Sequence, residues 1–149
     1  MGEIQCLVNN AFAFTSKGLD ATSADWDRVL KAGPIAYAVM AQCVAGPMKQ
    51  QGGGAIVNVS SISAFIAQPQ RWTYNAAKGA VHTLTKRMAL DLSPYGIRVD
   101  SISPGWIWTR ENDKQLVVIA LDGNLSGDNS TCSSGAESLW NAPPLFSAY

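Results

Sequence analysis

The sequence predicts an α/β domain built around a parallel sheet. Three short apolar segments, IQCLVNNA, AIVNVSS and IRVDSISPG, have the composition of buried strands, and each ends in polar or turn-forming residues. Two longer segments with apolar residues at helical spacing separate them. Alternating strands and helices imply right-handed crossovers and a parallel sheet, whose ligand site lies at the carboxyl ends of the strands.

The first helix follows the strand IQCLVNNA after a short connection. We predict that it begins at Thr22 or Ser23, because either side chain can cap a helix and acidic residues follow within a turn. Its apolar periodicity continues to about Met48. Gly33 and Pro34 interrupt this pattern, and a proline inside a helix removes a backbone donor and clashes with the preceding turn. We therefore expect the helix to bend or break there.

Three consecutive glycines, Gly52 to Gly54, precede the second strand. A phosphate-binding turn requires the order strand, glycines, helix, so we interpret this segment as a flexible turn and not as a dinucleotide fingerprint. The strongest helix prediction follows the second strand, in YNAAKGAVHTLTKRMALDLSPYG, and ends at Pro94 and Gly96. Its apolar positions are Ala77, Val81, Leu84, Met88 and Leu92.

Polar segments follow all three strands, and they read NNA, SS and SPGWIWT. Because the strands are expected to be parallel, these segments should meet at one edge of the sheet, beside the first turn of the helix that carries Tyr74 and Lys78. Residues four apart lie on the same helix face, so the Lys78 ammonium can approach the Tyr74 hydroxyl. That geometry suits acid–base chemistry, although an isolated Tyr-x-x-x-Lys pair is more often an ordinary helix pair.

Composition excludes several classes of function. The 149 residues fit one domain, and 11 Lys and Arg balance 11 Asp and Glu, so no basic patch indicates nucleic-acid binding. We find neither an apolar run of transmembrane length nor a signal peptide at the N-terminus, so we expect no membrane association and a cytoplasmic location.

The residues that could hold a metal or form disulfides are scattered. Cys6, Cys43 and Cys132 are odd in number and far apart, which favours free thiols over a disulfide framework or a zinc site. His82 lacks neighbouring ligands, so we expect a helix-surface histidine and no metal. From about Arg110 the chain is rich in Ser, Gly, Asn and Asp, and we predict a domain over residues 1–109 followed by a divergent, mobile tail over 110–149.

Taken together, LVNNA, IVNVSS, YNAAKGAV and IRVDSISPGWIWT resemble the classical short-chain dehydrogenase/reductase family, from about Leu7 to Thr109. The family's catalytic serine lies thirteen residues before its tyrosine, and this spacing selects Ser61 over Ser60 and Ser63. The resemblance implies a Rossmann-like, doubly wound parallel sheet, here only its C-terminal part with about three strands. It also implies hydride transfer between NAD or NADP and a secondary alcohol or ketone.

The three residues implied as catalytic, Ser61, Tyr74 and Lys78, suit that chemistry. Oxidising an alcohol requires a base for the hydroxyl proton, and the ordinary pKa of a phenol, about 10, is too high for this at neutral pH. A nearby ammonium such as that of Lys78 favours the phenolate. Ser61 can hold the substrate oxygen by a hydrogen bond.

The resemblance also implies a set of cofactor-binding residues. Tyr74 and Lys78 would both belong to it, with Lys78 binding the nicotinamide ribose, and Asn9 and Ala11 would line the adenosine side. The nicotinamide pocket would be shaped by Pro104, Gly105, Ile107 and Thr109, with Thr109 near the carboxamide, while Trp106 and Trp108 are either core residues or a substrate wall. Family members commonly assemble through the Tyr–Lys helix and the preceding helix, so a homo-oligomer is expected.

The chain departs from the family pattern at several positions. We expect the adenosine half of the fold to be absent, because no Thr-Gly-x-x-x-Gly-x-Gly turn precedes the first strand and that strand corresponds to the family's fourth. Loss of its neighbour would leave one edge of the first strand exposed. Phe12 stands in place of a family glycine, Gly33 in place of an asparagine and Asp100 in place of an asparagine.

These departures leave alternatives to an active enzyme. One is a non-catalytic remnant that binds no nucleotide and survives as an interaction surface or a misfolded product. Another is an obligate subunit that completes its sheet with a partner chain.

Overall fold

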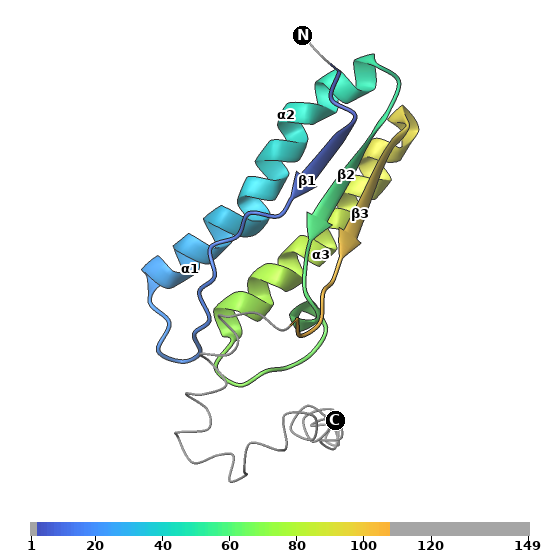
Figure 1. Cartoon of the computed structure of the whole chain (residues 1–149). Helices are drawn as coiled ribbons and strands as arrows, with labels where there is room; N and C mark the ends of the chain where they lie inside the picture. Colours follow the sequence, from blue (N-terminus) through green and yellow to red (C-terminus); the bar gives the residue numbers. More distant parts are fainter. Residues whose placement is uncertain (1–2, 108–149) are drawn as a thin grey trace. The chain divides into compact units, whose positions relative to one another are not determined.

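Three parallel strands form the sheet in the order β1-β2-β3 (Figure 1). This computed structural model describes residues 3–107. The strands are β1 (Cys6–Asn9), β2 (Gly54–Val59) and β3 (Ile97–Ile102). Asn9 pairs with Asn58, and Asn58 pairs with Ser101, so the polar residues at the carboxyl ends are aligned across the sheet. The predicted α/β class, strand positions and parallel arrangement are confirmed.

Two long helical segments connect the strands and lie on the same face of the sheet (Figure 1). The helical elements are α1 (Ser23–Leu30), the π-helical η1 (Lys31–Ile35), α2 (Ala36–Gln50), the 3-10 turn η2 (Ile62–Ala64), α3 (Trp72–Leu92) and the 3-10 turn η3 (Ser93–Tyr95). The α3 helix begins two residues before Tyr74, so Tyr74 and Lys78 lie within its first two turns.

The first helix begins and bends where the sequence predicts. Thr22 is the cap: its hydroxyl accepts a hydrogen bond from the Asp25 backbone N–H, and the Asp25 carboxylate accepts one from the Thr22 N–H. Gly33 has non-helical angles of φ −110° and ψ −109°, next to Pro34. The predicted interruption is therefore a kink between α1 and α2.

The hydrophobic core lies between the sheet and its two helices. Ala41, Val44 and Met48 of α2 contact Ile56 of β2 and the inward residues of β3, and Met48 and Ile56 have no exposed surface. Burial of these side chains removes apolar surface from water, which is the main stabilising contribution in a domain of this kind.

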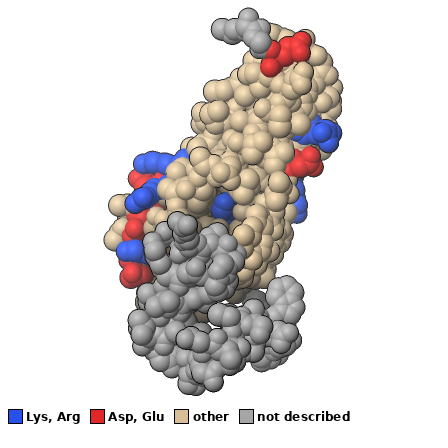
Figure 2. Space-filling model, in the orientation of Figure 1, with Lys and Arg blue, Asp and Glu red and all other residues tan. Residues whose placement is uncertain are grey.

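No helix of the described residues covers the other face of the sheet (Figure 1). Val8 at 58 % and Ile102 at 56 % are exposed large hydrophobic residues of that face. Figure 2 shows a broad uncharged area with charged side chains near its margins. β1 is also an edge strand, as expected from the sequence.

One sequence expectation is wrong. Ser23–Gln50 has a mean hydropathy of 1.3 over an 18-residue window, and by length and composition it could cross a membrane. We expected no such run. The same helix supplies Ala41, Val44 and Met48 to the core, so part of its apolar surface packs against the sheet.

The chain divides into two compact units, Met1–Trp106 and Ile107–Tyr149. Apart from Ile107, the second unit lies outside the described residues, as do the predicted mobile tail, Trp108 and Cys132. The predicted division after residue 109 stays a prediction. Cys6 and Cys43 are free and exposed, as expected.

Candidate active site

A cavity of about 280 Å³ lies at the carboxyl ends of the strands, where the sequence predicts a ligand site. The segments that follow β1, β2 and β3 all contribute to its wall, together with the first turns of α3. Its lining consists of Asn10, Phe12, Phe14, Val59, Ser60, Ser61, Tyr74, Lys78, Pro104 and Gly105. The three residues expected to be catalytic, Ser61, Tyr74 and Lys78, therefore face one cavity.

The three serines that follow β2 have different hydrogen-bond partners. Ser60 Oγ donates to the Lys78 carbonyl oxygen at 3.1 Å, and Ser63 Oγ donates to Gln68 Oε1 at 2.6 Å. Ser61 Oγ accepts from the Ser63 backbone N–H at 3.1 Å and has no acceptor for its own proton among the described residues. Ser61 can therefore donate to a ligand in the cavity, which agrees with its selection by spacing.

Lys78 is a buried lysine with only 4 % of its surface exposed. Its Nζ donates to the Val59 carbonyl oxygen at 2.8 Å and lies 4.0 Å from the centre of the Phe12 ring. Burial lowers the pKa of Lys78 from 10.5 to about 8, because the charged form loses hydration. The ammonium therefore remains mainly protonated at neutral pH, and it keeps further N–H donors beyond the one bonded to Val59.

Tyr74 stands beside Lys78 on the same face of α3. The Lys78 Nζ lies 5.9 Å from the centre of the Tyr74 ring, so the two side chains are neighbours; a close approach of the ammonium to the hydroxyl stays a prediction. Two phenylalanines from the segment after β1 hold the ring: Phe12 at 5.6 Å, edge to face, and Phe14 at 5.0 Å, tilted. Such aromatic contacts restrict the phenol to one position in the cavity wall.

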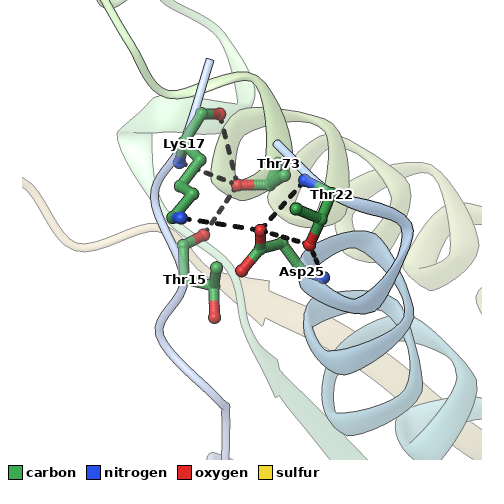
Figure 3. A network of polar contacts seen from close by, with 5 residues as sticks. All are labelled: Thr15, Lys17, Thr22, Asp25 and Thr73. Atoms are coloured by element: carbon green, nitrogen blue, oxygen red, sulfur yellow. Dashed lines mark hydrogen bonds and ion pairs between the residues drawn. The ribbon is translucent and has the colours of Figure 1, made fainter. Parts of the chain in front are cut away.

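The segment that carries both phenylalanines is tied to the start of α3 by Thr73 (Figure 3). The Thr73 hydroxyl donates to the Thr15 carbonyl at 2.8 Å and accepts from the Lys17 N–H at 3.0 Å. Lys17 Nζ lies 3.7 Å from the carboxylate of Asp25, which also takes part in the Thr22 cap (Figure 3). Thr73 is fully buried, so this anchor fixes the segment next to Tyr74.

A buried chain of polar side chains lies behind the cavity. Asn9 Nδ2 donates to Asn58 Oδ1 at 2.8 Å, and Asn58 Nδ2 donates to Thr85 Oγ1 at 3.0 Å. Thr85 in turn donates to the Val81 carbonyl one turn earlier. Asn58 and Thr85 were not predicted from the sequence, although the polar residue inside the apolar segment AIVNVSS is a signal that could have indicated Asn58.

Tyr37 of α2 was also missed from the sequence. Its side chain is 2 % exposed, and its hydroxyl has no hydrogen-bond partner among residues 3–107. Burial, and to a smaller extent the charge of nearby Tyr74, raises the pKa of Tyr37. Tyr37 is therefore a neutral phenol at physiological pH.

The remaining predicted cofactor residues are distributed as follows. Pro104 and Gly105 line the cavity, Ala11 is exposed, and Asn9 is 5 % exposed within the buried polar chain. Ile107 begins the second unit, and Thr109 lies outside the described residues. The assignment of these residues to a cofactor stays a prediction.

The alternatives for the other singled-out residues are partly resolved. Trp106 is 57 % exposed, with the Arg71 guanidinium 5.3 Å from its ring, so it is not a core residue. His82 packs edge to face on Phe65 at 4.5 Å, and its Nδ1 has no hydrogen-bond partner in the described part of the chain. No group of three or more potential metal ligands occurs among residues 3–107.

Comparisons with known proteins show the family of this chain. The family model for short chain dehydrogenases matches residues 1–116. A cyclopentanol dehydrogenase from Comamonas sp. is 40 % identical over 71 % of this chain and 43 % of its own length. An uncharacterized oxidoreductase from Thermotoga maritima is 38 % identical over 76 % of this chain and 45 % of its own length.

A solved structure is similar as well. The gluconate 5-dehydrogenase from Burkholderia cenocepacia, in complex with NADP and tartrate, superimposes with a TM-score of 0.72 at 38 % identity, over 78 % of this chain and 46 % of that one. The chain thus spans less than half of the length of these relatives. The match of the family model over most of the sequence, together with the parallel sheet and its cavity, shows that this chain belongs to the short chain dehydrogenase family.

Proposed function

We propose that this chain carries the catalytic side of a nicotinamide-dependent oxidoreductase site, which transfers hydride between NAD or NADP and a secondary alcohol or ketone. One observation carries the proposal: Ser61, Tyr74 and Lys78 line a single cavity at the carboxyl ends of a parallel sheet. The names of the relatives support the reaction class, since they include a cyclopentanol dehydrogenase and a gluconate 5-dehydrogenase.

Each residue has a distinct role in this proposal. Ser61 donates its free proton to the substrate oxygen and orients the reacting carbon. Tyr74 exchanges a proton with that same oxygen. The Lys78 ammonium, close to the Tyr74 ring, stabilises the negative charge that the phenol acquires when it acts as a base.

The residues around the cavity fit the nicotinamide half of such a cofactor. The ring of a nicotinamide, when bound, supplies or accepts the hydride. Lys78 has N–H donors left for ribose hydroxyls, and Pro104 and Gly105 offer an apolar and unobstructed wall for the flat ring. Among residues 3–107, no glycine-rich turn has the strand-before-helix position that a pyrophosphate requires.

A second candidate is a chain that binds no nucleotide. The Phe12 ring favours this candidate, because it covers one side of the Lys78 ammonium and occupies part of the cavity wall. In that case the fold would serve as an interaction surface.

The remaining proposals concern the substrate, the location and the oligomeric state of the protein. We propose a small alcohol or carbonyl substrate, a cytoplasmic location and self-association. Ile35, Val39 and Met40 support self-association, since they are apolar, close to half exposed, and neighbours on one side of the α2 region.

Titration of the purified chain with NADH and with NADPH, followed by fluorescence, tests the function. We expect micromolar binding that Lys78→Ala weakens at least about tenfold, while Lys86→Ala, an exposed lysine two turns further along α3, leaves it unchanged. Tyr74→Phe should bind cofactor but abolish oxidation of secondary alcohols. A folded chain that binds neither nucleotide would favour the second candidate.

A further inference from the structure

The ring of Phe12 lies at the centre of the candidate site and contacts both members of the Tyr–Lys pair. The Lys78 Nζ lies 4.0 Å from the ring centre, within the range of a cation–π interaction. The ring meets Tyr74 edge to face, at 5.6 Å and 89°. Phe12 is therefore in contact with the two side chains on which the proposed chemistry depends.

The position of this ring depends on Gly33, which lies in the kink between α1 and α2. A Cβ atom at Gly33 would come 2.5 Å from Cε2 and 3.1 Å from Cδ2 of Phe12, closer than side chains tolerate. Gly33 is buried, and the ring occupies the space that any larger residue at position 33 would fill. Phe12 and Gly33 are thus a matched large and small pair, although 21 positions separate them.

We propose that Phe12 is a positioning residue for Lys78: its ring, seated on Gly33, holds the ammonium against the Val59 carbonyl and stabilises the protonated form. The ring and the carbonyl oxygen contact the same Nζ, at 4.0 Å and 2.8 Å. The inference deepens the proposed function, because Lys78 is the group that prepares Tyr74 in that reaction. Its test does not require activity or cofactor binding.

Among the described residues, no carboxylate forms an ion pair with the Lys78 ammonium. The ion pairs there join Lys17 to Asp25 and Lys31 to Asp27, and neither includes Lys78. On β3 the charged side chains alternate with buried Ile97 and Val99, so Arg98 and Asp100 lie on the far face of the sheet. Among the phenols, Tyr74 has its ring centre 5.9 Å from the ammonium, and Tyr37 interacts with Tyr74.

Burial and the ring act on Lys78 in opposite directions. Burial disfavours the charged form and lowers the pKa, whereas the electron-rich face of the ring favours the charged form and raises it. Phe12→Leu keeps most of the volume but removes the ring face, so the pKa of Lys78 should fall below the wild-type value. Phe12→Gly opens the site to water, so the pKa should rise towards 10.5.

Nuclear magnetic resonance of lysine labelled with ¹³C at Cε measures both effects, with the Lys78 signal assigned through Lys78→Met. We expect the pKa to fall by about 0.5 to 1 in Phe12→Leu. Phe12→Tyr retains the ring and should restore the wild-type value. A pKa in Phe12→Leu equal to the wild-type value would show that the ring only fills space and would overturn the proposal.

A second pair of variants tests the packing of the Phe12 ring on Gly33 without substituting a residue that lines the cavity. Gly33→Ala must displace the ring, so the pKa of Lys78 should change although residue 33 does not line the cavity. Gly46→Ala in α2 is the matched control, because a Cβ there meets nothing within 4 Å. An unchanged Lys78 signal in folded Gly33→Ala would also contradict the inference, whether or not the chain binds nicotinamide.

Discussion

The buried ammonium of Lys78 should make the stability of the protein depend on pH in a defined window. The pKa of Lys78 is 10.5 in the unfolded chain and about 8 in the folded one. Between these values the unfolded state binds more protons, so the free energy of unfolding rises with pH. Below about pH 8 the lysine is charged in both states and its burial penalty is constant, and above 10.5 it is neutral in both.

The size of the effect follows from the two pKa values. A fall from 10.5 to about 8, at about 1.36 kcal/mol per pKa unit, corresponds to about 3 kcal/mol. Lys78 is 4 % exposed, so solvent screens this penalty only weakly. Tyr37 opposes the trend at the upper end: its raised pKa means that stability falls once the unfolded phenol ionises above about pH 10.

Lys78→Met isolates the lysine, because both proteins carry Tyr37 and every other titrating group. Urea unfolding of the two proteins at intervals from pH 7 to 11 gives the difference in their free energies of unfolding. This difference should rise by about 3 kcal/mol in favour of wild type across the window. Lys86→Met, at an exposed position of α3, is the control and should give a flat difference. If the difference between wild type and Lys78→Met also stays constant from pH 7 to 11, the claim that burial lowers the pKa of Lys78 is refuted.

Substitutions at three buried positions test the scaffold of the site, with the free energy of unfolding in urea as the readout. Thr73→Val should lower the free energy of unfolding by about 1 to 3 kcal/mol, because it removes the hydrogen bonds to residues 15 and 17. Thr83→Val, at an exposed position, should lower it little. Equal losses in the two variants would contradict the role of Thr73 as an anchor. Asn58→Ala should cost about 2 to 4 kcal/mol, against near zero for exposed Asn10→Ala, and a smaller loss would contradict the buried polar chain. Ile56→Ala should cost about 2 to 5 kcal/mol and Ile56→Val about 1, and equal losses would argue against tight packing of the core.

Local chemistry in the sequence determined much of the fold. The strands and helices were predictable because buried strands, amphipathic helices, the cap at Thr22 and the break at Gly33 and Pro34 each depend on neighbouring residues. The convergence of Ser61, Tyr74 and Lys78 on one cavity followed from parallel strands and from residues four apart on a helix. The expectation that no apolar segment reaches transmembrane length was wrong for Ser23–Gln50, whose length and composition would allow it to cross a membrane although it packs on the sheet.

Only the tertiary structure decided how residues from distant segments meet. Asn9 of β1 hydrogen-bonds Asn58 of β2, and the buried hydroxyl of Tyr37 has no hydrogen-bond partner within the described part of the chain. From the sequence, Phe12 and Gly33 were two separate departures from a family pattern. In the folded chain they are one feature, because the ring of Phe12 occupies the space above Gly33 and reaches Lys78. Such contacts depend on side-chain volume at particular distances, and no periodicity along a chain encodes them.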